Sequence, residues 1–383
     1  MTYFSRHDLE HLGGICFLFE NNTDLDAAKK IFCDWSEQTG AQAYLSIAMK
    51  RYQQWSLLQI SASDTLRALT PSYNTVDLSR RLGLQAVQSS REIDLEIVLA
   101  MARGPRAYCF PSCDEFFAAL RLRRLTADAA RQTQLAFDPE GLERPAEYWT
   151  YQEYKGFTLN AGADLITALT QTLQPQTERS SYTFSCFRAS EYVLLLALAQ
   201  ELKQTHPTML AQIEALWRTR ALRADDFNDA FVHEHGKLET PLPLKFYVPG
   251  DRVWFRNPDE ASANIQGFEG SWVCYLGAGQ FSNFWDRAHP YTLEQKCLEV
   301  YHWRHGVAHK PDGTLWMDEV IVQELVLQST KDSLATQAIL TQMMKVRDGR
   351  GIYAQGGCID ATRDAIRWVC PATADINAHN IVS

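Results

Sequence analysis

The chain of 383 residues lacks the features that would direct it to a membrane or to nucleic acid. No apolar run approaches the roughly 18 residues that a membrane-spanning helix needs. The opening stretch, MTYFSRHDLEHLGG, has no basic region followed by an apolar core, so it does not predict a secretory signal. A formal net charge of −9 argues against binding to phosphate backbones or anionic lipids. We therefore expect a cytoplasmic protein, or one exported by a route without a cleavable signal, with neither nucleic acid nor membrane as a partner.

The sequence also lacks internal repeats, low-complexity tracts and a zinc-binding pattern. Cys109 and Cys113 are separated by three residues, but no second pair with zinc-finger spacing follows. We expect no metal and no other cofactor. The cysteines are odd in number and scattered, which favours reduced thiols. They are Cys16, Cys33, Cys109, Cys113, Cys186, Cys274, Cys297, Cys358 and Cys370.

What the chain does contain is an ordinary globular composition, with 46% hydrophobic and 22% charged residues. The opening pattern predicts a strand at ICFLF, a helix starting near Thr23 or Asp24, and two further strands. The stretch RGPRA, Arg103–Ala107, breaks this pattern with glycine and proline. We interpret residues 1–103 as a small α/β domain of unassigned role.

Beyond that boundary we expect a main domain over residues 107–320 and an extension over 321–383 that packs on it. The stretch CDEFFAALRLRRLTADAARQTQLA predicts a pair of helices, with its basic part, Arg121–Leu125, as a solvent-exposed helix edge. A β-hairpin is expected around Lys155 and Gly156, and a β-rich region from Leu242.

Cys186 lies where a short β-like run, YTFS, meets the apolar stretch ASEYVLLLALAQEL. Unpaired N–H groups and the positive dipole end at a helix N-terminus favour a thiolate, so a cysteine there can become a nucleophile. The competing interpretation is a buried, inert core thiol.

The order of motifs around Cys186 resembles the NlpC-type papain-like peptidases and, more closely, the spore-coat protein-glutamine γ-glutamyltransferases, which are bacterial transglutaminases. The resemblance runs over about residues 108–306, through YTFSC, FYVPGDRVWFRNPD, GSWVCYLGAGQF and TLEQKCLEVYHWRHG. It implies an α+β fold with a papain-like core, in which a nucleophile at a helix N-terminus packs on an antiparallel sheet.

The resemblance places Cys186 at the family nucleophile and also exposes departures. The family has a glutamate directly before its cysteine and another opening the YLG strand, where this chain has Ser185 and Ser271. Where the family has a histidine on the next strand, this chain has Asn283. Serine cannot act as a general base near neutral pH, so the implied dyad is incomplete.

Several residues offer a replacement for the missing base. Glu269, two residues before Ser271, would share its strand face, or else belongs to a solvated turn. Asn283 would orient a base or cap a turn. Further candidates for the base are His233, His235, His302 and His305, and Trp254, Trp272 and Trp285 would line an acyl tunnel or pack in the core.

The resulting hypothesis is acyl transfer on protein glutamine through a thioester at Cys186. The partners would be a protein with an accessible glutamine and a lysine or another amine, giving a cross-link, or water, giving deamidation. Two alternatives stay open at this point. One is a catalytically inactive papain-like scaffold that binds proteins, and the other is an amidase or peptidase acting on cell-wall peptides.

Overall fold

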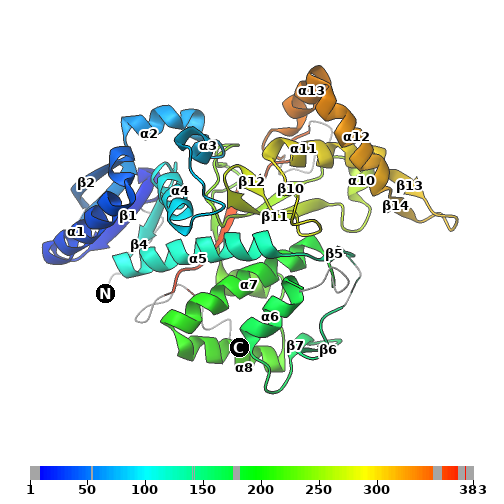
Figure 1. Ribbon diagram of the computed structural model, residues 1–383, viewed down its shortest axis with the longest axis horizontal. Helices are drawn as coiled ribbons and strands as arrows, with labels where there is room; N and C mark the ends of the chain where they lie inside the picture. Colours follow the sequence, from blue (N-terminus) through cyan, green and yellow to red (C-terminus); the bar gives the residue numbers. More distant parts are fainter. Residues whose placement is uncertain are drawn as a thin grey trace.

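The computed structural model describes residues 9–52, 55–139, 141, 143–175, 182–347, 356–369 and 376. Helices surround two β-sheets (Figure 1). The α-helices are α1 (Asn22–Thr39), α2 (Asp64–Leu69), α3 (Leu78–Leu82), α4 (Ser90–Ala102), α5 (Cys113–Gln132), α6 (Leu165–Leu173), α7 (Cys186–Thr205), α8 (Pro207–Thr219), α9 (Asp225–Phe231), α10 (Glu260–Ala263), α11 (Leu293–His302), α12 (Glu319–Lys331) and α13 (Ser333–Met343).

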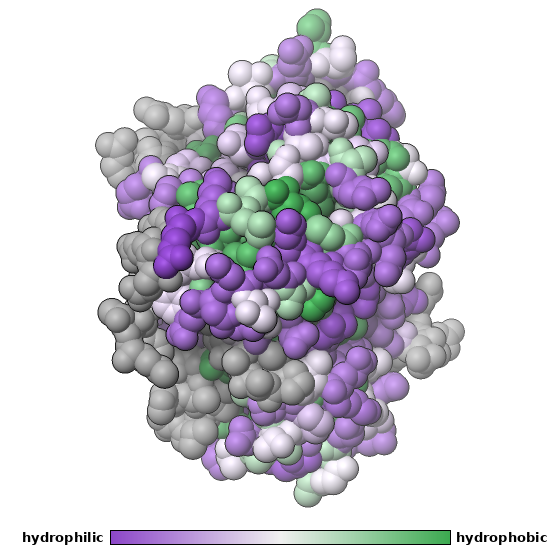
Figure 2. Space-filling model, turned by 90° about the vertical axis from the view of Figure 1, so that its left-hand side faces the viewer, coloured by the Kyte–Doolittle hydropathy of each residue, from purple (hydrophilic) through white to green (hydrophobic). Residues whose placement is uncertain are grey.

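The first sheet follows the predicted order of strand, helix and two strands, which is confirmed. Its strand order is β2-β3-β1-β4, with β1 antiparallel to β3. Helix α1 begins at Asn22, where the Asn21 side chain accepts a hydrogen bond from the Asp24 N–H at 2.9 Å and caps the helix. The strands are β1 (Gly14–Phe19), β2 (Leu45–Tyr52), β3 (Trp55–Ala62) and β4 (Ala107–Phe110). Figure 2 shows this side of the molecule as mainly hydrophilic, with a small group of apolar residues near its middle.

The first sheet continues beyond the expected boundary at 103–107, because β4 pairs in parallel with β1. The hydrophobic core also crosses it. Phe116 of α5 contacts the ring of Phe17 at 5.7 Å and that of Phe110 at 5.5 Å between centroids. The sheet and its core therefore join residues on both sides of the boundary, and a separate domain over residues 1–103 stays a proposal.

Helix α5 corrects two expectations about its sequence. It is one helix of 20 residues rather than a pair. Its basic middle is also not a solvent-exposed edge, because Arg123 is buried and forms a 2.7 Å ion pair with Asp251. Arg121 pairs with Glu201 at 2.7 Å and Arg124 with Asp94 at 2.5 Å. Carboxylates from other elements thus balance these charges, so the helix continues through them.

The second sheet carries the segment that resembles the transglutaminases. Its order is β12-β11-β10-β15-β9, and every neighbouring pair is antiparallel. The segment 321–383, expected as an extension packed on the core, supplies β15 to the interior of this sheet. The strands are β9 (Val232–His235), β10 (Arg252–Arg256), β11 (Gly270–Gly277), β12 (Gln280–Phe281) and β15 (Arg363–Ile366).

Helix α7 lies between α5, α6, α8 and β11 at the centre of the molecule (Figure 1). Its residues from Ala189 to Ala199 are all buried, which explains the unbroken apolar sequence from Tyr192 to Ala199. The described residues also form three two-stranded pairs: β5 (Ala136–Phe137) with β8 (Thr183–Phe184), β6 (Trp149–Gln152) with β7 (Gly156–Leu159), which is the predicted hairpin, and β13 (Val307–His309) with β14 (Leu315–Met317).

Candidate active site

Cys186 is the first residue of α7, as the sequence predicts, and it is half-buried. The Ser185 side chain caps the helix by accepting a hydrogen bond from the Arg188 N–H at 3.3 Å. Ser185 stands where the resemblance expects a glutamate, and its hydroxyl has this structural use. The thiol is therefore held at the positive end of a long helix dipole.

The start of β11 faces the Cys186 sulfur from the other side. The thiol donates to the Gly270 carbonyl oxygen at 3.9 Å. Burial raises the pKa of Cys186, whereas hydrogen bonds from the backbone N–H groups of Trp272 and Phe187 and the positive charge of Lys296 lower it. Burial has the larger effect, so in the free protein the neutral thiol is favoured over the thiolate more strongly than in an exposed cysteine.

A cavity of about 280 Å³ opens beside Cys186. Its walls come from the N-terminus of α7, the start of β11, the loop after β12, helix α11 and the first turns of α12. The volume suits one side chain rather than a folded segment. The lining residues are Phe137, Cys186, Gly267, Phe268, Gly270, Ser271, Asn283, Trp285, Asp286, Tyr291, Lys296, Glu299, Trp303, Glu319 and Gln323.

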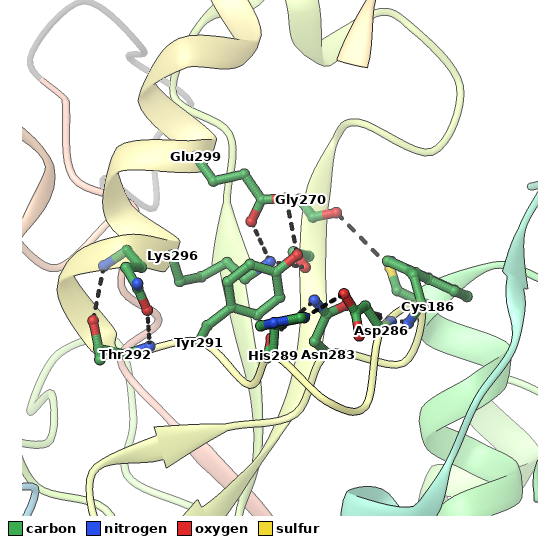
Figure 3. A network of polar contacts seen from close by, with 12 residues as sticks. Cys186, Gly270, Asn283, Asp286, His289, Tyr291, Thr292, Lys296 and Glu299 are labelled. Carbon is green, nitrogen blue, oxygen red and sulfur yellow. Dashed lines mark hydrogen bonds and ion pairs between the residues drawn. The ribbon is translucent and has the colours of Figure 1, made fainter. Parts of the chain in front are cut away.

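Lys296 and Glu299 of α11 form a charged network in this cavity that sequence reasoning missed (Figure 3). The Lys296 ammonium donates to the Ser271 hydroxyl at 3.3 Å, forms an ion pair with Glu299, and lies 3.6 Å from the Tyr291 ring centroid. Burial and the charge of Glu299 raise the pKa of Tyr291, so its hydroxyl stays protonated and donates to Glu299 at 3.4 Å.

A signal for Lys296 does exist in the sequence. Helical spacing puts position 296 on the same face as Leu293, Cys297 and Val300, all of which are buried. A lysine within an apolar helix face must find a buried partner or a cavity, and here it finds both.

The structure places the three other polar residues singled out from the sequence in different surroundings. Ser271 is buried and lines the cavity. Glu269 is exposed, does not line the cavity, and accepts a hydrogen bond from the Gly267 N–H at 3.1 Å. Asn283 lines the cavity, but its amide oxygen accepts from the N–H groups of Trp285 and Asp286, and its nitrogen donates to the His289 carbonyl. The Asn283 amide thus holds the loop together.

None of the four histidines considered from the sequence lines the cavity. His233 and His235 lie on β9, at the far edge of the second sheet. Burial lowers the pKa of His302 to about 4, and this ring shares a 2.8 Å hydrogen bond with Ser329. A histidine not considered, His289, lies in the loop beside the cavity, 2.7 Å from the Asp286 carboxylate (Figure 3).

The three tryptophans considered for either an acyl tunnel or the core lie in different places in the structure. Trp285 lines the cavity, whereas Trp254 and Trp272 stack on each other across β10 and β11, with ring centroids 5.8 Å apart.

Among the described residues, no group of three His, Cys, Asp or Glu side chains is arranged to hold a metal ion. In the same part of the chain, no helix is long and apolar enough to cross a membrane.

Comparison with known proteins agrees with the resemblance and extends it. A model of the protein-glutamine gamma-glutamyltransferase family matches residues 75–351, a longer stretch than 108–306. A solved transglutaminase from Geobacillus stearothermophilus, without its C-terminal extension, is similar at 19% identity and a TM-score of 0.39, covering 56% of this chain and 98% of that one. No curated protein matches the chain. Because the family model covers well over half of the sequence, the chain belongs to the protein-glutamine gamma-glutamyltransferase family.

Proposed function

We propose that this chain is a cysteine-dependent acyltransferase that acts on protein-bound glutamine through a thioester at Cys186. Family membership supports acyl transfer on protein glutamine in general. One local observation carries the rest. The Cys186 sulfur faces backbone N–H groups from two elements, Phe187 in α7 and Trp272 in β11, beside a cavity of side-chain size. We further propose a papain-like core within residues 107–320.

The first half-reaction follows from this geometry. The Cys186 thiolate would attack the Cδ carbon of the glutamine side chain, forming a C–S bond and moving negative charge to the amide oxygen. The N–H groups of Phe187 and Trp272 are the natural donors to that oxyanion. The C–N bond would then break, and the nitrogen would take up a proton and leave as ammonia.

The second half-reaction decides the product. A lysine amine attacking the thioester would give an isopeptide bond, and water would give glutamate. In both cases the C–S bond breaks and Cys186 recovers its proton. Cross-linking and deamidation therefore share the same intermediate and differ only in the acceptor.

The charged network of Lys296 and Glu299 would provide the stabilising charge and the general base that Ser271 cannot provide. Lys296 would stabilise the Cys186 thiolate, because a nearby positive charge favours the ionised thiol. Glu299, which shares the cavity, would accept the proton from the attacking amine or water. Glu269 as the base and Asn283 as the orienting residue stay hypotheses.

A second candidate function is a catalytically silent scaffold that binds proteins. The substitutions at Ser185, Ser271 and Asn283 favour it, as does the raised pKa of Cys186, because both reduce activation of the thiol. The two candidates differ in whether Cys186 is chemically reactive.

The deciding experiment measures acyl transfer directly. Dimethylated casein, which cannot act as a lysine donor, is incubated with a fluorescent primary amine and each protein, and labelling and ammonia release are followed in parallel. The variants are Cys186→Ala and, as the matched control, Cys33→Ala, which removes a half-buried cysteine of α1. We expect both signals in the native chain and Cys33→Ala, and neither in Cys186→Ala.

The ratio of labelling to ammonia release would separate cross-linking from deamidation. No labelling and no ammonia release from any of the three proteins would overturn the enzyme assignment in favour of the scaffold.

A further inference from the structure

Helix α12 forms one wall of the cavity beside Cys186. Glu319 and Gln323, one helical turn apart, both line it. The helix therefore presents one face to the cavity and continues past its rim. A substrate that enters the cavity would therefore pass close to the neighbouring surface of α12.

Two large apolar side chains lie next to that face and are exposed to solvent. Val320 is 65% exposed and Leu327 is 61% exposed. At 3.6 residues per turn, Leu327 is about 40° around the helix from Gln323, and Val320 about 20° further. We call Val320 and Leu327 the apolar stripe. Trp316 of β14, 40% exposed, lies just before the end of α12 that carries Glu319.

Single exposed apolar residues are common and need no explanation. The apolar stripe differs in its place, because on α12 it lies next to Glu319 and Gln323, which line a cavity too small for more than one side chain. A polypeptide that inserts a glutamine there keeps its backbone outside, against the rim. Leu327 is about 6 Å along the axis from Gln323 and about 12 Å from Glu319, which corresponds to two to four residues of extended chain.

We propose that the apolar stripe binds the polypeptide that carries the reactive glutamine, and that it selects an apolar side chain two to four residues from that glutamine on one side. This inference rests on the proposed function. It assigns α12 to substrate selection, separate from the chemical step at Cys186.

The test uses synthetic peptides with a central glutamine and either leucine or serine three residues away. One pair carries this residue before the glutamine, and a second pair carries it after the glutamine. The proteins are the native chain, Val320→Ser/Leu327→Ser, and the matched control Leu334→Ser. Leu334 is 78% exposed but lies on α13, beyond the end of α12, and does not line the cavity. Turnover is followed by ammonia release, and binding by fluorescence anisotropy in the Cys186→Ala background.

We expect the native chain and Leu334→Ser to prefer the leucine peptide about tenfold in kcat/KM and in affinity, on one side of the glutamine only. The double variant should lose the preference and keep its rate on the serine peptide. Equal preference in the native and double-variant proteins would overturn the proposal. A native chain that is dimeric, together with a double variant that is monomeric, would also overturn it, because the stripe would then be a contact between copies.

The two proposals fail in different ways. If no protein releases ammonia but the Cys186→Ala binding preference depends on the stripe, the acyl-transfer assignment fails and the binding surface stands. If turnover is normal but insensitive to the stripe, the binding surface fails alone. Unchanged circular dichroism is the folding control for these exposed positions.

Discussion

The ammonium of Lys296 lies 3.3 Å from the hydroxyl of Ser271. Ser271 stands in β11 between Gly270 and Trp272, whose backbone groups face the Cys186 sulfur. The resemblance expects a carboxylate at Ser271, so this chain has a positive charge close to the place where a negative one is expected. A cation lowers the pKa of a thiol and a carboxylate raises it. We infer that Lys296, together with the backbone N–H groups of Trp272 and Phe187, favours the ionised form of Cys186.

Lys296→Met should therefore make Cys186 harder to ionise. Because burial already raises the pKa of Cys186, we expect iodoacetamide alkylation to increase with pH beyond the ordinary cysteine value of 9.0, with the profile shifted further upward in the variant. At neutral pH the variant should react about tenfold more slowly, because loss of the nearby positive charge disfavours the thiolate. The pH profile of alkylation at this one cysteine is the measurement.

Lys245→Met is the matched control for this experiment. Lys245 also forms an ion pair with a carboxylate of α11, 3.5 Å from Glu294, but it does not line the cavity. Its alkylation profile should match that of the native chain. Equal shifts in both variants would show a general effect of charge or stability and remove Lys296 from the mechanism.

Glu299→Gln and Glu269→Gln distinguish the two carboxylates proposed as the base. Losing a general base costs about 10²-fold or more in rate. We expect that loss in Glu299→Gln and a change within about twofold in Glu269→Gln, because only Glu299 lines the cavity. Glu299→Gln also frees Lys296, so Cys186 should be alkylated at least as fast as before while ammonia release falls. A parallel fall in both readouts would indicate a structural role, and a selective loss in Glu269→Gln would support the prediction made from the sequence.

Ser271→Glu tests whether the missing family carboxylate limits the reaction. Position 271 is beside Lys296 and lines the cavity, so a glutamate there has an immediate counter-ion. We expect ammonia release to increase at least about tenfold over Ser271→Gln, which has the same size without the charge. Equal rates in the two variants would mean that the chain no longer depends on a base at this position.

The position of Cys186 at the start of a helix could be predicted because its signals are local in the sequence. Cys186 follows a short β run and opens a long apolar stretch, and these neighbours alone indicate a helix N-terminus. The hypothesis that Glu269 is the base, rather than part of a solvated turn, is also a local inference, from alternation along a strand. It depended on β11 including position 269, but the strand begins at Gly270.

The charged network could not be predicted in the same way, because it forms only when α11 packs beside β11. Lys296 is more than a hundred positions from Cys186 in the sequence, and no periodicity within either segment joins them. Arg123 shows the same limit in the fold. Its basic neighbours predict solvent exposure, and only the packing of Asp251 against α5 makes burial favourable.

Glu96 of α4 connects helix α3 to the hairpin between β11 and β12 through hydrogen bonds. It is fully buried and accepts hydrogen bonds from the Ser79 hydroxyl at 2.6 Å, the Tyr275 hydroxyl at 3.2 Å and the Ala278 N–H at 3.0 Å. Truncating it to alanine would leave these donors unsatisfied. Glu96→Ala should therefore lower the free energy of unfolding by about 2–4 kcal/mol, as urea titration would measure.

Glu96 also predicts a pH dependence of stability with a definite sign. Burial raises its pKa in the folded protein above the ordinary 4.5, despite the hydrogen bonds that favour the charged form. The folded state then keeps a proton that the unfolded chain releases, so this contribution to stability is complete below pH 4.5 and is lost as pH rises through the folded pKa. Each unit of pKa difference is worth about 1.4 kcal/mol. We expect the difference in unfolding free energy between the native chain and Glu96→Gln to shrink from pH 4.5 upward, because glutamine cannot titrate. A difference that stays constant or grows with pH would mean that Glu96 is ionised in the folded protein and that the hydrogen bonds from Ser79, Tyr275 and Ala278 outweigh burial.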